Sequence, residues 1–498
     1  MTTWVELLER RARERPHLPL LVFLADGETE AGRMDGPTLR DRALAAAGWL
    51  APFRGERVVL LLPAGLDFLP TFLGALLAGV VPVPAPPPVS AHPARNRQRF
   101  ASIAADARPA AVVAGADGLA MLDLGLGTSC VGLRVEDCPR EPSGACPLAV
   151  PSPGEVAYLQ YTSGSTGAPR GTRITHGNLA AMARILEEAK GYGPESRSVV
   201  WVPPWHDDGL VHGLLQPLQT GFQAVVMPPA AFAARPVRWL AAIARHRATH
   251  SGGPDFAYDL CVRKVRDEEA AGLDLSSWGF AYDAAEPIRP ATLDAFSARF
   301  APHGFRRESF APCYGLAEAT LSVTVARGGP HVLRVDRRRL EREGRIEPAA
   351  GPGAREVCSC GRPVRDTEVE IVRPGSAEPC PPGEVGEIVV SGPAVAAGYT
   401  TGSEDTFPAP GRVRTGDLGF LLDGELFVTG RAKDVLVFRG EKRAPHEIEW
   451  TVASCHAAIR PGAAAAFSID RGGAEALAIA VEVRSDLEAG GESGVFDS

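Results

Sequence analysis

The sequence predicts an α/β fold with mostly parallel sheets, because strand-like and helical patterns alternate along it and this alternation recurs. Short runs of branched apolar residues, such as 57–62 and 110–114, alternate with helical patterns such as 39–50. The composition, with 45% hydrophobic and 22% charged residues, is typical of a globular protein that buries a sizeable core. At 498 residues the chain exceeds what one core usually organises, so we expect a subdivided body and at least one smaller domain.

The same alternation recurs further along the chain. Helices are expected near 236–246 and near 290–300. Strand-like runs precede them at 198–202, 224–227 and 279–282. We therefore expect two related α/β lobes in a large N-terminal body.

The pattern changes after about Gly328, where short alternating strands are separated by turns rich in proline and glycine. We expect a β-rich subdomain over about 329–430, which completes an N-terminal domain of residues 1–430. The polar segment 431–434 separates two apolar runs and is predicted to be a hinge. Residues 435–498 are then expected to form a small α+β C-terminal lid.

Charge and hydropathy argue against several classes of partner. A net charge of −8, spread along the chain, disfavours non-specific binding of nucleic acid or of an anionic membrane surface. The N-terminus has charged residues early and predicts an amphipathic helix rather than a signal peptide. The most apolar segment, 69–83, is shorter than the roughly 20 residues that span a bilayer, so we expect a buried helix end and no membrane insertion.

Nine cysteines are scattered through the chain without a Cys-x-x-Cys pair, so we expect reduced thiols and a cytoplasmic location. Two groups of cysteines could hold a metal, but their spacings match no known site geometry. These groups are Cys130, Cys138 and Cys146, and Cys358 with Cys360. A structural role is the expectation for all of them.

A loop rich in glycine and hydroxyl side chains, 161–171, follows a predicted strand at 156–161 and precedes a helix that starts near Thr175. Glycines let the backbone wrap an anion, and hydroxyl groups add donors. Arg170 adds a positive charge that persists at any relevant pH. The segment predicts a phosphate-binding loop, although a run of this composition alone is also typical of a surface loop.

This loop and the segment Thr-His-Gly-Asn-Leu at 175–179 resemble the ATP-phosphate loop of the acyl-adenylate-forming (AMP-binding) superfamily, and they differ from a Walker loop. The family usually has a lysine where Arg170 stands, which keeps the charge but alters its reach. Further family motifs follow in the expected order. They lie at 205–210 (Trp-His-Asp-Asp-Gly-Leu), 285–287 (Ala-Glu-Pro), 314–320 (Tyr-Gly-Leu-Ala-Glu-Ala-Thr), 414–417 (Arg-Thr-Gly-Asp) and 430–434 (Gly-Arg-Ala-Lys-Asp).

Within this superfamily the chain is most similar to the fatty acyl-AMP ligases, which load acyl carrier proteins. Segments 251–264 and 275–278 and the added stretch 332–348 carry this similarity. In those ligases an insertion of this kind accompanies poor use of coenzyme A and transfer to the phosphopantetheine arm of a carrier protein. The resemblance therefore implies activation of a carboxylic acid to acyl-AMP, with ATP and Mg²⁺ as cofactors and an acyl carrier protein as partner.

The resemblance also implies roles for single residues. Those expected to bind the nucleotide are Thr162, Ser163, Gly164, Ser165, Thr166, Gly167, Ala285, Glu286, Pro287, Tyr314, Gly315, Asp417 and Arg431. Those expected at the reacting groups are Arg170, His206, Glu318, Thr320, Arg431 and Lys433, with Glu318 as the Mg²⁺ ligand. Those expected in the acyl pocket are His206, Asp208, Gly253 and Asp283. Singly, each residue has an ordinary structural interpretation as a surface charge, a turn or a core position, and the joint order of the motifs favours the site.

Two departures from the ligase pattern concern the acyl pocket. Asp208 stands where those ligases typically have methionine, and 283–287 reads Asp-Ala-Ala-Glu-Pro instead of Asn-Gly-Ala-Glu-Pro. Carboxylates are costly when buried without partners, so we hypothesise an acid that carries a polar or cationic group. The alternative is that Asp208 is solvated and Asp283 caps a helix.

The C-terminal lid is expected to be incomplete. Adenylate-forming enzymes usually carry a lysine near the end of a longer lid, and here no lysine follows Lys442. Three explanations stay open: a shortened lid, a chain that is a piece of a longer protein, or catalysis that has weakened into a nucleotide-binding role. An acyl-CoA ligase is the alternative enzyme, and consumption of coenzyme A separates it from an acyl-AMP ligase.

Overall fold

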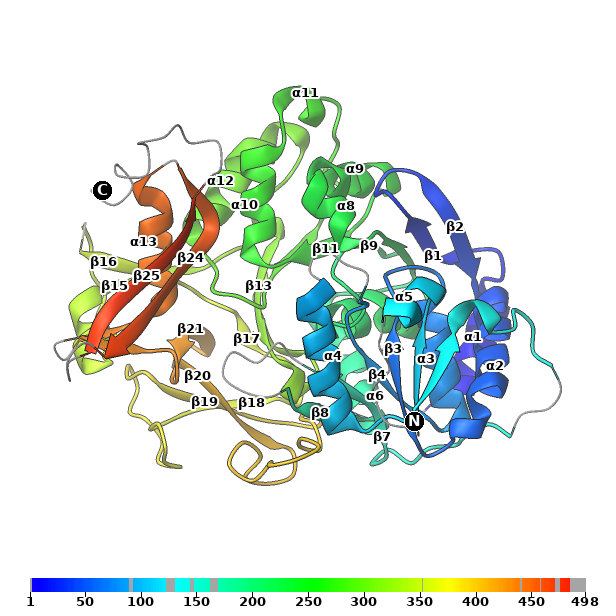
Figure 1. Cartoon of the computed structure of the whole chain (residues 1–498). Coiled ribbons are helices and arrows are strands. Elements are labelled where there is room, and N and C mark those ends of the chain that lie inside the picture. Colours follow the sequence, from blue (N-terminus) through cyan, green and yellow to red (C-terminus); the bar gives the residue numbers. More distant parts are fainter. Residues whose placement is uncertain are drawn as a thin grey trace.

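The computed structural model describes residues 2–88, 93–121, 130–143, 147–161, 169–351, 353–438, 441–456, 458–470 and 475–483. The helices are α1 (Trp4–Glu14), α2 (Gly36–Leu50), α3 (Phe68–Ala78), α4 (Pro93–Ala107), α5 (Ala116–Met121), α6 (His176–Lys190), α7 (Gln216–Thr220), α8 (Pro229–Ala234), α9 (Val237–His246), α10 (Asp255–Lys264), α11 (Asp267–Ala270), α12 (Pro290–Phe300) and α13 (Pro445–Cys455). In Figure 1 the N-terminal helices and α13 lie at opposite ends of the molecule.

The strands follow the predicted division into an α/β body and a β-rich region. In the body they are β1 (Pro19–Leu24), β2 (Glu30–Asp35), β3 (Arg57–Leu61), β4 (Val81–Pro84), β5 (Ala111–Ala114), β6 (Val131–Arg134), β7 (Val156–Tyr161), β8 (Gly171–Thr175), β9 (Arg197–Val200), β10 (Gln223–Val226), β11 (His250–Gly253), β12 (Phe280–Asp283), β13 (Phe310–Gly315) and β14 (Ser322–Val325). After it come β15 (Val332–Asp336), β16 (Ala354–Cys358), β17 (Arg362–Pro363), β18 (Glu368–Val372), β19 (Gly386–Ser391), β20 (Arg412–Leu422), β21 (Glu425–Arg431), β22 (Leu436–Phe438), β23 (Glu441–Arg443), β24 (Ile459–Asp470) and β25 (Glu475–Val483).

Two largely parallel sheets organise the body. One has the strand order β4-β3-β5-β6 and is parallel throughout. The other has the order β17-β14-β13-β12-β11-β9-β10-β1-β2, in which the strands from β13 to β1 are parallel and the outer strands are antiparallel. The predicted α/β class is confirmed.

The side chains of each strand show which helices cover which face of a sheet, because successive side chains point to opposite faces. Val58 and Leu60 of β3 pack with α2, α3 and α6, whereas Val59 and Leu61 pack with α4. Helices α2, α3 and α6 therefore lie between the two sheets, and α8, α9, α10 and α12 pack on the far face of the larger one.

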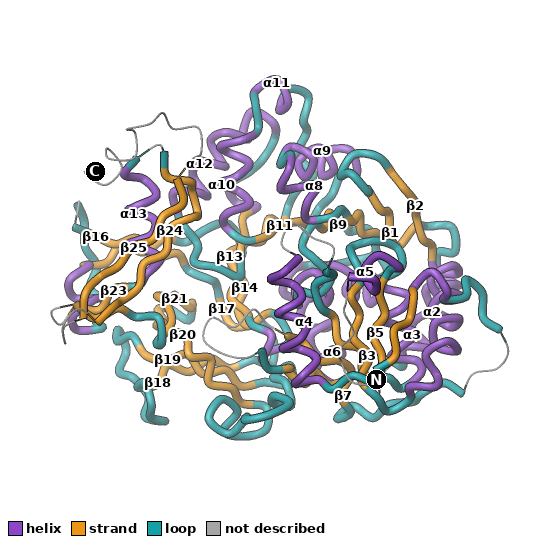
Figure 2. Tube along the Cα trace, viewed as in Figure 1, coloured by secondary structure: helices purple, strands orange, loops and turns teal. Residues whose placement is uncertain are grey.

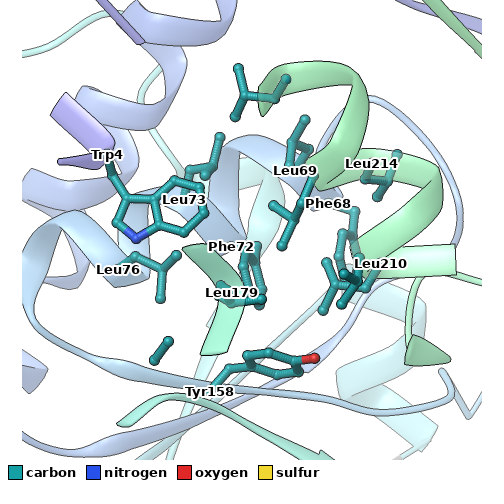
Figure 3. Close-up of a cluster of buried hydrophobic side chains, with 14 of the residues drawn as sticks. Trp4, Phe68, Leu69, Phe72, Leu73, Leu76, Tyr158, Leu179, Leu210 and Leu214 are labelled. Carbon is teal, nitrogen blue, oxygen red and sulfur yellow. The ribbon is translucent and has the colours of Figure 1, made fainter. Parts of the chain in front are cut away.

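The central layer is the main core of the protein. Figure 3 shows Phe72 of α3, Leu179 of α6 and Tyr158 of β7 converging beside Trp4. Helix α3 is buried on every side, so the apolar segment 69–83 is a complete buried helix followed by β4 rather than only a helix end. No described helix is long and apolar enough to cross a membrane.

The region after the body is rich in strands (Figure 2). Strands β18, β19, β20 and β21 form an antiparallel sheet. The added stretch 332–348 contributes β15 and a short π-helical turn, Arg339–Glu343. From this turn Glu341 pairs with Arg443 of β23 at 3.0 Å, and Arg355 of β16 pairs with Glu447 of α13. The added stretch and the strand that follows it are therefore tied to the start of the C-terminal region.

The segment 431–434 begins with the last residue of β21 and continues as a turn. This position suits the predicted hinge, and the domain boundaries themselves stay a prediction. Beyond it, the described part of the C-terminal region consists of β22, β23, α13 and the β24–β25 hairpin.

Candidate active site

A cavity of about 1280 Å³ opens at the carboxyl ends of β9, β11, β12 and β13. The β20–β21 region and the 431–434 turn close its other side. Ligands of α/β proteins bind at this edge of a parallel sheet because the connecting loops leave a crevice there. The cavity joins two regions, which we name the Asp417 end (Tyr314, Glu318, Asp417 and Arg431) and the Lys190 end (Lys190, Asp208 and Tyr282, with the buried His212 that contacts Asp208 and Tyr282 but does not line the cavity).

Many of the predicted site residues line this cavity. They are Arg170, His206, Asp208, Gly253, Ala285, Tyr314, Gly315, Glu318, Asp417, Arg431 and Lys433. The cavity lining does not include Asp283, Glu286, Pro287 or Thr320. The predicted phosphate-loop residues Thr162, Ser163, Gly164, Ser165, Thr166 and Gly167 lie outside the described residues.

Asp417 connects the other side chains at its end of the cavity by hydrogen bonds. The Tyr314 hydroxyl donates to its Oδ2 at 2.7 Å, and Arg431 Nε donates to its Oδ1 at 2.9 Å. Burial raises the pKa of Asp417, while the charge of Arg431 and the Tyr314 hydrogen bond oppose that rise. A carboxylate has about four acceptor sites, so Asp417 keeps capacity to accept further hydrogen bonds from a ligand.

Glu318 and Arg170 approach the same space through Tyr399. The Tyr399 hydroxyl donates to Glu318 Oε1, and the Arg170 guanidinium lies 4.2 Å from the centre of the Tyr399 ring. Arg170 also donates to the Gly402 carbonyl at 3.1 Å. The tyrosine thus positions a carboxylate and a guanidinium at one wall, and Glu318 Oε2 has no hydrogen-bond partner among the described residues.

Contrary to the expectation, Thr320 does not face the cavity. Its side chain is fully buried and its hydroxyl donates to the Ala394 carbonyl at 2.6 Å. Its φ of 66° lies in the left-handed region, which a β-branched residue rarely adopts. In this structure Thr320 supports the loop that carries Glu318 instead of presenting its hydroxyl to a ligand.

His206 lies beside Asp207 at the rim of the cavity. Its Nδ1 is 2.7 Å from Asp207 Oδ1, and its side chain is half-exposed. The charge of Asp207 raises the pKa of His206 to about 9, against the opposing effect of burial. At neutral pH His206 is therefore an imidazolium that can attract a carboxylate.

Gly253 leaves room for the indole of Trp201, which also lines the cavity. A Cβ atom at residue 253 would lie 2.4 Å from Trp201 Cζ2. Any larger side chain would therefore displace the indole. Gly253 therefore lies in the pocket wall, as predicted, and its lack of a side chain makes room for the Trp201 indole.

The Asp208 side chain is only 15% exposed at the Lys190 end, and each of its oxygens meets a neighbouring side chain. His212 Nδ1 lies 3.1 Å from its Oδ1, and the Tyr282 hydroxyl donates to its Oδ2 at 2.8 Å. Burial raises the pKa of Asp208, but the His212 hydrogen bond, the Lys190 charge and the Tyr282 hydrogen bond together lower it. The alternative that Asp208 is solvated is wrong.

Asp283 was expected in the pocket, and the alternative was a helix cap. The structure contradicts both, because Asp283 is fully buried in β12, and neither carboxyl oxygen has a hydrogen-bond partner among the described residues. Burial and the charges of Asp255 and Glu286 raise its pKa well above the usual range. Glu286 accepts from the Phe256 N–H at 2.6 Å.

The motifs did not reveal Lys190, His212, Tyr282 and Tyr399. Lys190 ends α6, which begins with a capping box between Thr175 and Asn178. It continues the buried stripe of Met182 and Leu186 at four-residue spacing. A lysine on a buried helical stripe is the signal that points to it.

The fold and the cavity define an adenylate-forming enzyme, and comparison with known proteins agrees. Residues 8–400 match the family described as AMP-binding enzyme, and the chain belongs to this family. It is 40% identical to the medium-chain-fatty-acid–[acyl-carrier-protein] ligase JamA of Moorena producens, over 98% of this chain and 86% of that protein. It is 36% identical to the putative fatty-acid–CoA ligase FadD21 of Mycobacterium tuberculosis, over 88% of this chain and 79% of that protein.

A solved structure supports the same assignment. It comes from a study of fatty acyl-adenylate ligases from E. coli and L. pneumophila, with a TM-score of 0.92 and 32% identity. The match covers 100% of this chain and 90% of the solved one. The predicted similarity to fatty acyl-AMP ligases is confirmed.

Proposed function

We propose that this enzyme activates a fatty or modified acyl acid with ATP to acyl-AMP and transfers the acyl group to the phosphopantetheine arm of an acyl carrier protein. The observation that carries the proposal is the continuity of the cavity, in which the Asp417 end and the Lys190 end share one space. An enzyme that joins a nucleotide to an acid must hold both in one water-poor site.

The residues of the Asp417 end suit a nucleotide. Asp417 accepts hydrogen bonds from the ribose hydroxyls, as carboxylates do in other nucleotide sites, and Arg431 fixes its orientation. Tyr314 offers a ring face to adenine, and Ala285 and Gly315 line the same wall. Arg170 and Lys433 line the cavity and neutralise phosphate charge, while His206 orients the acid's carboxylate. The loop 162–167 donates hydrogen bonds to the phosphates, as the family resemblance implies.

The donor set at Glu318 fits Mg²⁺. This ion is usually held by one or two carboxylates together with substrate phosphates, and Glu318 presents one oxygen without a described partner to the cavity. No group of three or more potential metal ligands occurs among the described residues. Substrate phosphates and waters, which Mg²⁺ usually keeps, would complete the coordination of an ion held by Glu318. When bound, Mg²⁺ supplies positive charge that stabilises the departing pyrophosphate.

Transfer to a carrier protein rather than to coenzyme A rests on two observations. JamA, the relative reported above, is named as an acyl-carrier-protein ligase. The added stretch 332–348 is tied to the C-terminal region by the Glu341–Arg443 pair. The FadD21 name favours the acyl-CoA ligase alternative.

The cysteines of the described part are free, which supports the expected cytoplasmic location.

The test is pyrophosphate release with ATP, Mg²⁺ and a panel of carboxylic acids, followed by addition of carrier protein or coenzyme A. We compare the wild type with Glu318→Gln and with Glu308→Gln, an exposed carboxylate away from the cavity. We expect acid-dependent release that falls roughly 100-fold or more in Glu318→Gln only. Consumption of coenzyme A in place of carrier loading supports the alternative. ATP binding without release for any acid contradicts the proposal and favours a nucleotide-binding role.

A further inference from the structure

Lys190 brings a cationic side chain into the buried wall of the cavity. The residue is only 5% exposed, yet it lines the cavity. Its Nζ lies 4.7 Å from the centre of the Tyr282 ring and 5.9 Å from that of Phe280. It makes no hydrogen bond or ion pair with any residue that the structure describes. An ammonium group has three donors, so Lys190 keeps hydrogen-bonding capacity that protein groups do not use.

The polar groups around Lys190 are already engaged with one another. Tyr192 contacts His212 Nε2 through its hydroxyl, and His212 Nδ1 and the Tyr282 hydroxyl each meet one oxygen of Asp208. Burial and the Lys190 charge lower the pKa of His212, so this imidazole is neutral at pH 7 and donates through Nδ1. Each Asp208 oxygen already accepts from a protein donor, whereas the Lys190 ammonium group has no protein acceptor among the described residues, so Lys190 is the member of this cluster whose donors are all left for a ligand.

The position of Lys190 assigns it to the acyl chain rather than to the nucleotide. Tyr282 pairs in register with Ala311, three residues before Tyr314 on the same strand. Three residues of a strand span roughly 10 Å, so the backbone of Tyr282, whose ring faces Lys190, lies deeper in the sheet than the backbone of Tyr314. An acid whose carboxylate reacts near His206 and Glu318 would extend its chain towards Lys190.

From this geometry we infer that the acid carries a hydrogen-bond-accepting oxygen on its chain, which Lys190 receives at the inner end of the cavity. A carbonyl, hydroxyl or carboxylate oxygen has the required chemistry. A cationic substituent would meet the ammonium group at close range, so the structure favours an acceptor over the cationic group considered from sequence. A site built to hydrogen-bond a substituent also rejects chains that lack it.

This inference rests on the proposed acyl-adenylating function, and one experiment separates their failures. Pyrophosphate release is measured with unsubstituted, hydroxy, oxo and dicarboxylic acids of matched chain length, over a range of lengths. The enzymes are the wild type, Lys190→Met, which keeps the length of the side chain without its charge, and Lys264→Met. Lys264 is exposed at the end of α10 and does not line the cavity, so it is the matched control.

We expect the wild type and Lys264→Met to prefer an oxygen-bearing acid by at least about tenfold in kcat/KM, the size of one charge-assisted hydrogen bond. Lys190→Met should lose most of that preference through a higher KM for the oxygen-bearing acid. The oxo and hydroxy acids report a neutral acceptor, and the dicarboxylic acids report an anionic one.

A wild-type preference for unsubstituted acids at every length overturns the inference and leaves the adenylating function intact. A preference that persists in Lys190→Met overturns it equally. If no acid of any class releases pyrophosphate, the proposed function fails and the inference fails with it. Thermal unfolding reports whether Lys190→Met is folded, and if it is not, the wild-type acid panel decides on the same criterion.

Discussion

The two ends of the cavity use charge in different ways. At the Asp417 end, Asp417 lies within β20, Arg431 ends β21 and Glu318 lies in a short helical turn. Glu318 and Asp417 keep acceptor capacity for a ligand. At the Lys190 end, the polar groups come from a helix terminus, a π-helical turn and a buried strand, and they mostly satisfy one another. The first end suits a ligand that all members of the family share, and the second suits one particular acid.

This difference implies that the ends can be perturbed separately. Changes at the Asp417 end should alter the use of ATP and leave acid preference unchanged. Changes at the Lys190 end should do the reverse. An effect that crosses from one end to the other would contradict the division.

Among the changes that test this division between the two ends, the largest expected effect comes from Asp417→Ala. The change removes the proposed acceptor for the ribose hydroxyls and leaves Arg431 and the Tyr314 hydroxyl without their partner. Hydrogen bonds to a charged group are worth about 1.5–3 kcal/mol each, so loss of those to the ribose hydroxyls should raise the KM for ATP at least roughly 30-fold. Pyrophosphate release at varied ATP measures it, with Asp423→Asn, an exposed position, as the control. Altered acid preference in Asp417→Ala would break the comparison.

The next effect is expected for Gly253→Ala. The added methyl group would collide with Trp201, and overpacking of this kind costs about 1–3 kcal/mol. The indole should move into the acyl region, raising the KM for the acid while the KM for ATP stays within about twofold. Gly193→Ala is the matched control, because a Cβ atom there meets nothing within 4 Å. A change confined to ATP would contradict the assignment of Gly253 to the acyl region.

The same two ends differ in how far sequence could predict them. Residues of the Asp417 end lie in contiguous motifs whose order is readable along the chain, and Tyr314, Glu318 and Asp417 meet in the cavity as expected. Whether the other predicted residues reach the cavity depends on how the strands pair over long sequence distances. Asp283 follows the strand pattern into the buried side of β12, which no local pattern distinguishes from the cavity side.

The Lys190 end shows the opposite limit. Lys190, His212 and Tyr282 belong to three separate elements and meet only because α6 lies between the two sheets. The α/β class and most element positions could be predicted, because apolar periodicity is a local property. Which polar side chains converge depends on how the elements pack, and one sequence does not carry that information.

A moderate effect is expected from pH, through His206 at the junction of the two ends. The pKa of His206 is raised to about 9 by Asp207, so its positive charge is present at neutral pH and is lost as the pH rises through about 9. The KM for the acid should therefore stay level near pH 7 and rise by about two- to fivefold above pH 9, because solvent screens a half-exposed charge. Initial rates in His206→Gln should show no such rise. A rise that persists in His206→Gln would assign the titration to another group.

The smallest effect concerns Ala285, which lines the cavity with a φ of 71° in the left-handed region. An alanine in this conformation is strained by about 1 kcal/mol, and a glycine is not. Ala285→Gly should therefore raise the free energy of unfolding by up to about 1 kcal/mol in denaturant titrations. Ala284→Gly, where φ is not positive, should lower it by a similar amount. A change in the KM for ATP in Ala285→Gly would show that the strained backbone helps to shape the nucleotide wall. If the free energy of unfolding falls in both Ala285→Gly and Ala284→Gly, the left-handed conformation carries no strain that glycine can relieve.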